Sequence, residues 1–288
     1  MTKNRKKIKL LLIDPQRGFM DINVKDEYKN FPLLKDYIKE LYVDGADEDA
    51  KRIAGLIRRG GKEITSITVT LDSHHVNHIA NYTSWLILDS NNRWVHPDPF
   101  TLVPPEDIES GKIRTRNPAL NAYALYYTKA LRDNKRYVLC LWPLHCLIGS
   151  PGYDIEKNIY AALVEWEIEY GRHVIKVTKG SNYKTEHYSA AMADVPDPQD
   201  PTTSLNKNLI DDLENYDEIL IAGEASSHCV ANTVMDIANH ISEEAVKKFI
   251  FLEDGSSPVQ GFENLETEFI DQMKVKGMKV LKTTEYQF

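Results

Sequence analysis

Short apolar runs alternate with amphipathic stretches along the chain, and this alternation limits the folds available to it. The predicted strands are Ile8–Ile13, Ile64–Leu71, Tyr137–Trp142, Val174–Val177, Glu218–Ala222, Lys248–Leu252 and Lys279–Lys282. The predicted helices are Gly45–Arg59, Ala119–Asn134, Glu156–Tyr170, Leu205–Glu214, Cys229–Ile241 and Asn264–Val275. Most strands are apolar at nearly every position, which is typical of strands covered on both faces. The pattern predicts a three-layer α/β/α fold, Rossmann-like, with a mostly parallel open sheet of about six strands.

The strand and helix pattern runs through the whole sequence, so we expect a single domain over residues 1–288. About 65 residues separate Leu71 from Tyr137, which is more than one crossover helix requires. We therefore expect an ordered insertion at about 80–136. Its stretch from Trp94 to Asp107 is rich in proline and aromatic residues and has the character of a lid. A second interruption, at about 194–204, is expected to be a surface loop.

Composition and charge exclude several classes of protein. The net charge of −8 argues against a nucleic-acid partner, and no apolar run is long enough to span a membrane. Three cysteines are too few for a disulfide framework and are typical of a reducing compartment. The apolar run after the basic arm Lys3–Lys7 is interrupted by Lys9 and lacks the cleavage site of a signal peptide. We expect a solvated arm and a cytoplasmic location.

The segment around Cys229 predicts a strand, a tight turn at Gly223 and a helix that begins near Ser227. A thiol in the first turn of a helix faces unpaired N–H groups and the positive end of the helix dipole, and both favour the nucleophilic thiolate. A lone buried cysteine more often packs as a small apolar residue. Reactive side chains at the other strand ends favour catalysis for Cys229.

Sites in open parallel sheets form beyond the carboxyl ends of the strands. Alone, Asp14 would cap a turn and Lys179 would be a surface lysine. Beside a cysteine, an aspartate can take the thiol proton and an ammonium lowers the pKa of the thiol. The residues at or just beyond the ends of the predicted strands are Asp14, Asp72, His74, Trp142, His145 and Lys179.

The stretch Asp72-Ser-His74-His75-Val-Asn-His78 has the composition of a metal site. A carboxylate and imidazoles suit zinc, iron or manganese, and catalytic sites leave positions open for water or substrate. The spacing does not choose among the three histidines, and a polar loop is the alternative reading for His75 and His78. His145 can join this cluster only through the fold.

Together these segments resemble the isochorismatase-like cysteine hydrolases and, within them, the nicotinamidases. The resemblance extends from Leu10 to about Ala238 and keeps the family's order of motifs. The matching segments are Asp14-Pro-Gln-Arg-Gly-Phe19, Asp72-Ser-His74-His-Val-Asn-His78, Trp142-Pro-Leu-His145-Cys146, Lys179-Gly before Tyr188-Ser-Ala, and Gly223-Glu-Ala-Ser-Ser-His-Cys229-Val.

The resemblance implies a role for each matching residue. The implied triad is Asp14, Lys179 and Cys229. A divalent metal, zinc with iron or manganese as alternatives, would be held by Asp72, His74 and His145. The resemblance also implies a cis peptide at Glu224–Ala225 that aims the N–H groups of Ala225 and Cys229 at the substrate oxygen, and it implies that Phe19 and Trp142 flank an aromatic substrate.

The implied function is a metal-dependent cysteine amidohydrolase that releases ammonia from nicotinamide or a similar small aromatic amide through a thioester. The first alternative is a sibling hydrolase of the same superfamily that acts on another small amide or carbamoyl compound. A non-catalytic binding protein on the same fold is the second. The expected partner is a small-molecule amide, with no nucleic acid or membrane partner, and the exposed helices would permit a homo-oligomer.

Overall fold

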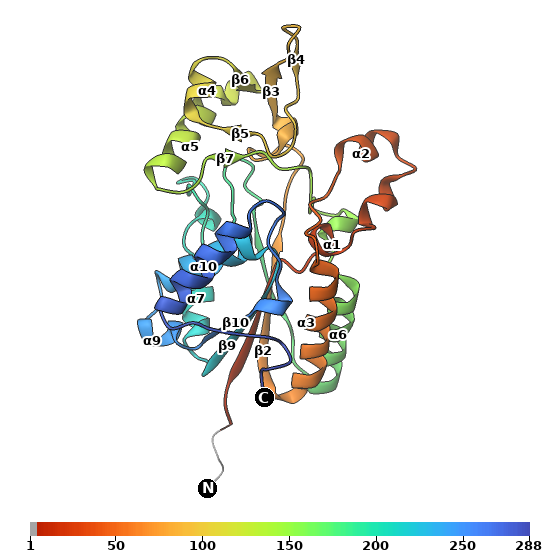
Figure 1. The fold of residues 1–288 in the computed structure, drawn as a ribbon, viewed down its shortest axis with the longest axis vertical. Helices are drawn as coiled ribbons and strands as arrows, with labels where there is room; N and C mark the ends of the chain where they lie inside the picture. The colour runs from red at the N-terminus through yellow and green to blue at the C-terminus, as the bar shows by residue number, and fades with distance from the viewer. Residues whose placement is uncertain (1–4) are drawn as a thin grey trace.

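The computed structural model describes residues 5–288 (Figure 1). Of the predicted arm, Lys3 lies outside the described residues and Arg5–Lys7 is exposed. The strands are β1 (Ile8–Ile13), β2 (Ile64–Asp72), β3 (Trp85–Leu88), β4 (Trp94–Val95), β5 (Leu102–Val103), β6 (Ile113–Thr115), β7 (Leu139–Cys140), β8 (Ile175–Lys179), β9 (Glu218–Gly223), β10 (Phe249–Leu252) and β11 (Lys279–Leu281).

The helices lie between these strands, mostly where the amphipathic stretches predict them. They are α1 (Arg17–Met20), α2 (Pro32–Tyr37), α3 (Ala46–Gly60), α4 (Pro105–Glu109), α5 (Asn121–Asp133), α6 (Lys157–Tyr170), α7 (Lys207–Leu213), α8 (Ala231–Ala238), α9 (Glu243–Val246) and α10 (Glu263–Val275). A π-helical segment, Ser226–Val230, leads directly into α8.

The main sheet has six parallel strands in the order β11-β10-β9-β1-β2-β8. The chain proceeds from β1 toward β2 and β8 on one side, and then toward β9, β10 and β11 on the other. The direction of strand order therefore reverses beside β1, and ligands bind at such a switch point in open α/β sheets. The predicted α/β/α fold with a parallel sheet of about six strands is confirmed.

The side chains of β1 show how the sheet is covered on both faces. Leu10 and Leu12 belong to a core cluster that includes Ile53 of α3 and Leu163 of α6. Leu11 alternates with them and belongs to the opposite cluster, which includes residues of α8 and α10. This alternation follows from the period of two in a strand. Figure 1 shows α3 and α6 on one side of the sheet, and α7 and α10 on the other.

The predicted strand Tyr137–Trp142 is wrong as a member of the main sheet. Only Leu139–Cys140 is a strand, and it pairs antiparallel with β5 in a separate two-stranded sheet. The segment then forms isolated bridges with the loop after β2, at Asn81–Trp142 and His74–Leu147. Its apolar character comes from packing in the layer above the sheet rather than from the sheet itself.

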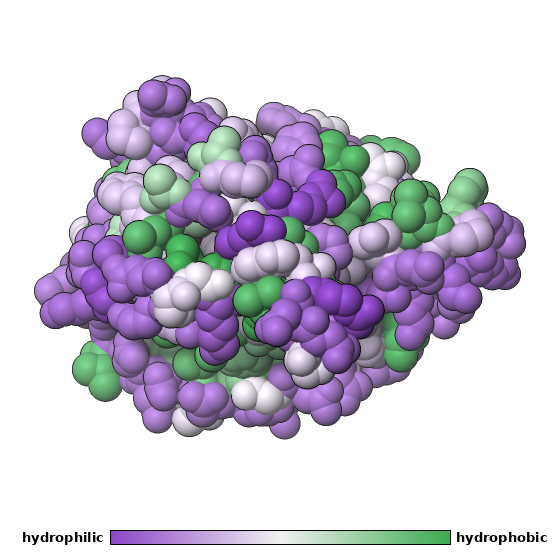
Figure 2. All heavy atoms as spheres, turned by 90° about the horizontal axis from the view of Figure 1, so that it is seen from above, coloured by the Kyte–Doolittle hydropathy of each residue, from purple (hydrophilic) through white to green (hydrophobic). Residues whose placement is uncertain are grey.

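The segment expected as an insertion, 80–136, contains β3 to β6, α4 and α5 and lies above the carboxyl end of the main sheet (Figure 1). Strands β4, β3 and β6 form a small antiparallel sheet. Seen from above, the molecular surface is mostly hydrophilic, with hydrophobic residues exposed among the polar ones (Figure 2). Across residues 5–288, none of the helices has the length and apolar character needed to cross a membrane.

Candidate active site

The predicted triad and metal residues come together at the carboxyl edge of four adjacent strands, β9, β1, β2 and β8. The strand register pairs Asp72 directly with Lys179, and Ile13 with Gly223. Asp14 follows Ile13, and Cys229 follows Gly223 after a short turn. The side chains at this edge are all buried, with Asp14 fully inaccessible to solvent.

Lys179 is the centre of the first cluster. Its Nζ lies 2.9 Å from Asp14 Oδ2, 2.9 Å from Asp72 Oδ1 and 3.4 Å from Cys229 Sγ. It also donates a hydrogen bond to the carbonyl oxygen of His187 at 2.8 Å. Burial opposes the charged form, but the two carboxylates hold the pKa of Lys179 well above its usual range. The ammonium group is therefore a fixed positive charge between the two aspartates and the thiol.

The surroundings of Cys229 oppose the thiolate that the sequence led us to expect. Burial raises the pKa of the Cys229 thiol well above its usual range, and Lys179 opposes this shift only in part because Asp14 and Asp72 add negative charge. Burial likewise raises the pKa of Asp14, against the pull of Lys179. These shifts favour the thiol over the thiolate, so a nearby base is needed to form the nucleophile.

The backbone around Asp14 fixes its carboxylate. Asp14 has a φ of 45°, in the left-handed region that aspartate tolerates better than most residues. Its N–H donates to Thr70 Oγ1 at 3.0 Å, and the Thr70 hydroxyl donates to Asp14 Oδ1 at 2.5 Å. Gly223 has a φ of 116°, and a Cβ there would lie 2.0 Å from the Ile13 oxygen. Only glycine lets the turn before Cys229 approach β1 so closely.

The turn between Gly223 and Cys229 contains a cis peptide bond at Glu224–Ala225. The N–H of Ala225 donates to no acceptor among residues 5–288 and remains available to a ligand oxygen. The Glu224 side chain lies outside the two clusters. Its Oε2 accepts a hydrogen bond from the Ser257 N–H at 3.1 Å, and burial together with Asp49 raises its pKa well above the usual range.

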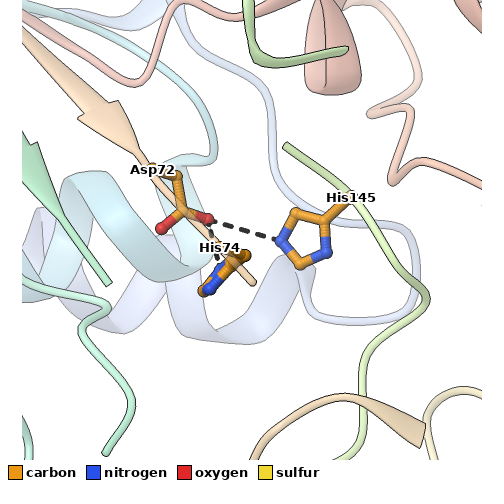
Figure 3. Close-up of side chains that lie close together, drawn as sticks. All are labelled: Asp72, His74 and His145. Atoms are coloured by element: carbon orange, nitrogen blue, oxygen red, sulfur yellow. Dashed lines mark ion pairs between the residues drawn. The ribbon is translucent and has the colours of Figure 1, made fainter. Parts of the chain in front are cut away.

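Asp72, His74 and His145 form the second cluster (Figure 3). Asp72 Oδ2 lies 2.8 Å from His74 Nε2 and 3.4 Å from His145 Nε2. His145 Nδ1 lies 2.7 Å from the Pro143 oxygen, which directs Nε2 toward the aspartate as in many metal-binding histidines. Although burial opposes it, His74 and Lys179 hold the pKa of Asp72 well below its usual range. One ionised carboxylate and two convergent imidazoles fit a divalent cation.

Sequence reasoning missed Glu186 as a member of this site. Glu186 is buried, and its carboxylate lies within 4.8 Å of ligand atoms of His74 and His78. It lies in a long loop after β8 with no metal-site spacing, so the sequence carried no signal for it. His78 serves another purpose, because its Nδ1 accepts from the Ala80 N–H at 3.2 Å and its Nε2 bonds the Thr185 oxygen at 3.1 Å. Both ring nitrogens are thus already bound by backbone.

A cavity of about 20 Å³ lies between the two clusters. Phe19 and Trp142 line it, together with Tyr188, His228, Lys179, Cys229 and the three residues of the second cluster. Burial lowers the pKa of His228 to about 4, so this imidazole is neutral at pH 7. The volume suffices for about one water molecule. A ligand that carries a ring requires the lining side chains to move apart.

The comparisons with known proteins give a fold but no sequence family. No protein-family profile and no curated protein matches the sequence. The yeast nicotinamidase bound to the inhibitor nicotinaldehyde is 18% identical, with a TM-score of 0.62, over 96% of this chain and 99% of that chain. A nicotinamidase pyrazinamidase of Acinetobacter baumanii is 18% identical, with a TM-score of 0.59, over 98% and 99%.

A pyrazinamidase of Pyrococcus horikoshii in complex with zinc is 17% identical, with a TM-score of 0.51, over 96% of this chain and 99% of that chain. The three solved structures agree over nearly the whole length of each chain. At these identities the likeness establishes the fold. The protein therefore has the fold of the nicotinamidase and pyrazinamidase structures, as the resemblance of its sequence motifs predicted.

Proposed function

We propose that this protein is a metal-dependent cysteine amidohydrolase that releases ammonia from nicotinamide or a similar small aromatic amide. One observation carries the proposal. The Asp14 carboxylate and the Cys229 thiol both lie within 3.4 Å of the Lys179 ammonium group, next to three residues that could hold a metal ion. The fold shared with nicotinamidase structures supports the same reading.

The mechanism begins from a Cys229 thiol whose pKa is raised by burial. Asp14 takes the thiol proton while Lys179 stabilises the forming thiolate. The sulfur attacks the amide carbonyl carbon, and the N–H groups of Ala225 and Cys229 stabilise the oxyanion by about 3 kcal/mol per donor. Asp14 returns its proton to the departing ammonia, and a thioester remains on Cys229. Water then adds to the thioester carbonyl carbon, the C–S bond breaks, the carboxylic acid leaves and the sulfur regains its proton.

Asp72, His74 and His145 would hold a divalent cation, with zinc favoured and iron or manganese as alternatives. Such an ion supplies Lewis acidity toward a ring nitrogen or a water molecule. Phe19 and Trp142 line the cavity and would enclose an aromatic ring. In this proposal these side chains orient the amide toward the sulfur and exclude bulk water from the thioester.

The size of the cavity favours a second candidate, a hydrolase for a smaller amide or carbamoyl compound. About 20 Å³ leaves no room for a pyridine ring unless side chains move. The same base, nucleophile and oxyanion donors would serve this substrate, and a smaller compound requires a smaller movement of the lining side chains.

The decisive experiment measures ammonia release from nicotinamide by the zinc-loaded protein, with and without a chelator. We expect chelator-sensitive release that disappears in Cys229→Ala and persists in Cys140→Ala, a matched change at another buried cysteine. Full activity of Cys229→Ala would contradict the mechanism. Release only from carbamoyl compounds supports the second candidate, and metal binding without any turnover indicates a non-catalytic protein.

A further inference from the structure

A cavity of about 800 Å³ lies apart from the candidate active site. It is bounded by β3, by the start of α5 and by the loops that follow β2 and β8, in the upper part of Figure 1. We call it the β3–α5 cavity. Its volume is typical of small-molecule sites, whereas the 20 Å³ cavity beside Cys229 is not.

The charges on the cavity wall are of one sign. Arg116 and Lys184 line it, and none of the lining residues is an aspartate or glutamate, although the chain has 43 acidic residues against 35 basic ones. The Arg116 side chain donates one hydrogen bond, to Asn77 Oδ1 at 3.3 Å, and forms no ion pair within residues 5–288. Lys184 Nζ lies 3.6 Å from a carboxylate oxygen of Asp197. Arg116 is thus the cation that remains available to a ligand.

Aromatic rings form much of the rest of the wall. Trp85, Tyr123 and Tyr183 line the cavity. The indole N–H of Trp85 donates to the Ile79 oxygen at 2.7 Å, and the Tyr123 hydroxyl donates to the Lys184 oxygen at 3.1 Å. Trp85 is inaccessible to solvent and supports the wall from within. Tyr123 is only partly buried, and because its hydroxyl is bound by backbone, it offers the cavity mainly apolar ring surface. Rings of this kind bind planar aromatic ligands.

We propose that the β3–α5 cavity binds a small organic anion with an aromatic ring, such as an aromatic carboxylate. The rings of Tyr123 and Tyr183 contact the ring of the ligand, and Arg116 pairs with its anionic group. The cavity is a separate site from the one beside Cys229. His78 forms part of the wall between them, since it lines the β3–α5 cavity and its ring centroid lies 4.6 Å from that of His74.

The test uses anilinonaphthalene sulfonate, an aromatic anion whose fluorescence rises on binding and which is too large for the cavity beside Cys229. We expect saturable binding to the full chain that weakens at high salt. Arg116→Ala should weaken binding about 10-fold, as expected for loss of a charged hydrogen bond, and Arg116→Glu should weaken it further. Arg93→Ala is the matched control, because Arg93 lies on the same segment but does not line the cavity.

A second variant tests the location without changing charge. Ser84 is half-buried and lines the cavity, so Ser84→Trp fills the space that the dye would occupy and should abolish binding. Thermal unfolding of each variant confirms that the fold is retained. Unchanged dye binding in both Arg116→Glu and Ser84→Trp would overturn the proposal.

Competition identifies the chemistry of the ligand. Naphthoate should displace the dye at least 10-fold more effectively than neutral naphthamide, because only the acid pairs with Arg116. Equal displacement by the two compounds would overturn the anionic part of the proposal. Inorganic phosphate should displace the dye poorly. Displacement by phosphate as effective as that by naphthoate would overturn the aromatic part.

Discussion

The charged side chains of the candidate active site are paired with one another, whereas the β3–α5 cavity has an arginine without an ionic partner among the described residues. Beside Cys229, a cavity of about 20 Å³ is surrounded by buried charges, and Lys179 contacts two carboxylates at 2.9 Å. In the β3–α5 cavity, about 800 Å³ are lined by Arg116 with a single amide partner. A buried charge must be paired within the protein, whereas a charge at an open cavity can be left for a ligand.

The largest expected effect comes from removing the central cation of the closed site. Lys179→Met leaves Asp14 and Asp72 buried without their shared ammonium, so we expect a loss of about 3–5 kcal/mol in the free energy of unfolding. Urea unfolding of the metal-free protein at pH 8 measures it. The loss should shrink at lower pH, since protonation neutralises the carboxylates.

The matched control is Lys51→Met, at an exposed lysine that pairs with Glu48. Exposed pairs contribute little to stability, so we expect no resolvable change in the free energy of unfolding. Equal destabilisation by Lys179→Met and Lys51→Met would show that a buried lysine stabilises the fold no more than an exposed one.

Asp194 is a buried carboxylate without a close ionic partner in the described part of the chain, so it tests whether a buried charge must be paired within the protein. Its Oδ2 accepts a hydrogen bond from the Tyr137 hydroxyl at 2.6 Å, while Arg136 Nε is 3.6 Å from Oδ1. Burial raises the pKa of Asp194 from 3.8 to about 7. The folded state therefore holds this proton more tightly than the unfolded state, and the resulting stabilisation is lost as pH rises from about 4 through 7.

We test this with Asp194→Asn, in unfolding experiments across pH 4 to 8. The advantage of the native protein over the variant should fall with rising pH by a few kcal/mol, at about 1.4 kcal/mol per pKa unit. A constant difference across this range would mean that Asp194 is ionised in the folded protein.

The metal site allows a comparison between two buried histidines. His145→Ala should weaken zinc binding by at least about 10-fold, because even residues that only support a metal ligand have effects of that size. His78→Ala should leave zinc binding nearly unchanged, since both ring nitrogens of His78 are bound by backbone. Zinc content after dialysis measures both. Loss of zinc in His78→Ala alone would place the metal between His74, His78 and Glu186 instead.

The smallest expected effect is on the stability of the Arg116→Ala variant. Arg116 is exposed and its side chain donates one hydrogen bond, so the free energy of unfolding should change by less than about 0.5 kcal/mol. Thermal unfolding without ligand provides the measurement. A loss above about 2 kcal/mol would show that Arg116 stabilises the fold and is not kept available for a ligand.

Several features of the fold were predictable because they depend on local pattern. The apolar runs Ile8–Ile13 and Glu218–Ala222 gave the strands β1 and β9 closely, and the helices α3, α6 and α10 lie where the amphipathic stretches predicted them. The run Tyr137–Trp142 was wrongly predicted as a strand of the main sheet, because burial above the sheet produces the same apolar pattern as burial within it.

The candidate site likewise has features that the sequence predicted and features that it did not. The motifs around Asp14, Lys179 and Cys229 predicted which side chains would meet, since parallel strands place their carboxyl ends at one edge. The protonation of Cys229 was not predictable from a helix terminus alone. It depends on full burial and on two carboxylates that come from other strands. Glu186 was missed because it reaches His74 through a loop without a motif.

The sequence by itself determined the order of strands and helices and the reactive residues at the strand ends, because these depend on periodicity and on neighbours along the chain. Tertiary structure alone decided the closed volume beside Cys229, the sharing of Lys179 by two aspartates and the open cavity at Arg116. Volume, burial and charge pairing arise between segments far apart in the chain, and they set the pKa values on which any chemistry here depends.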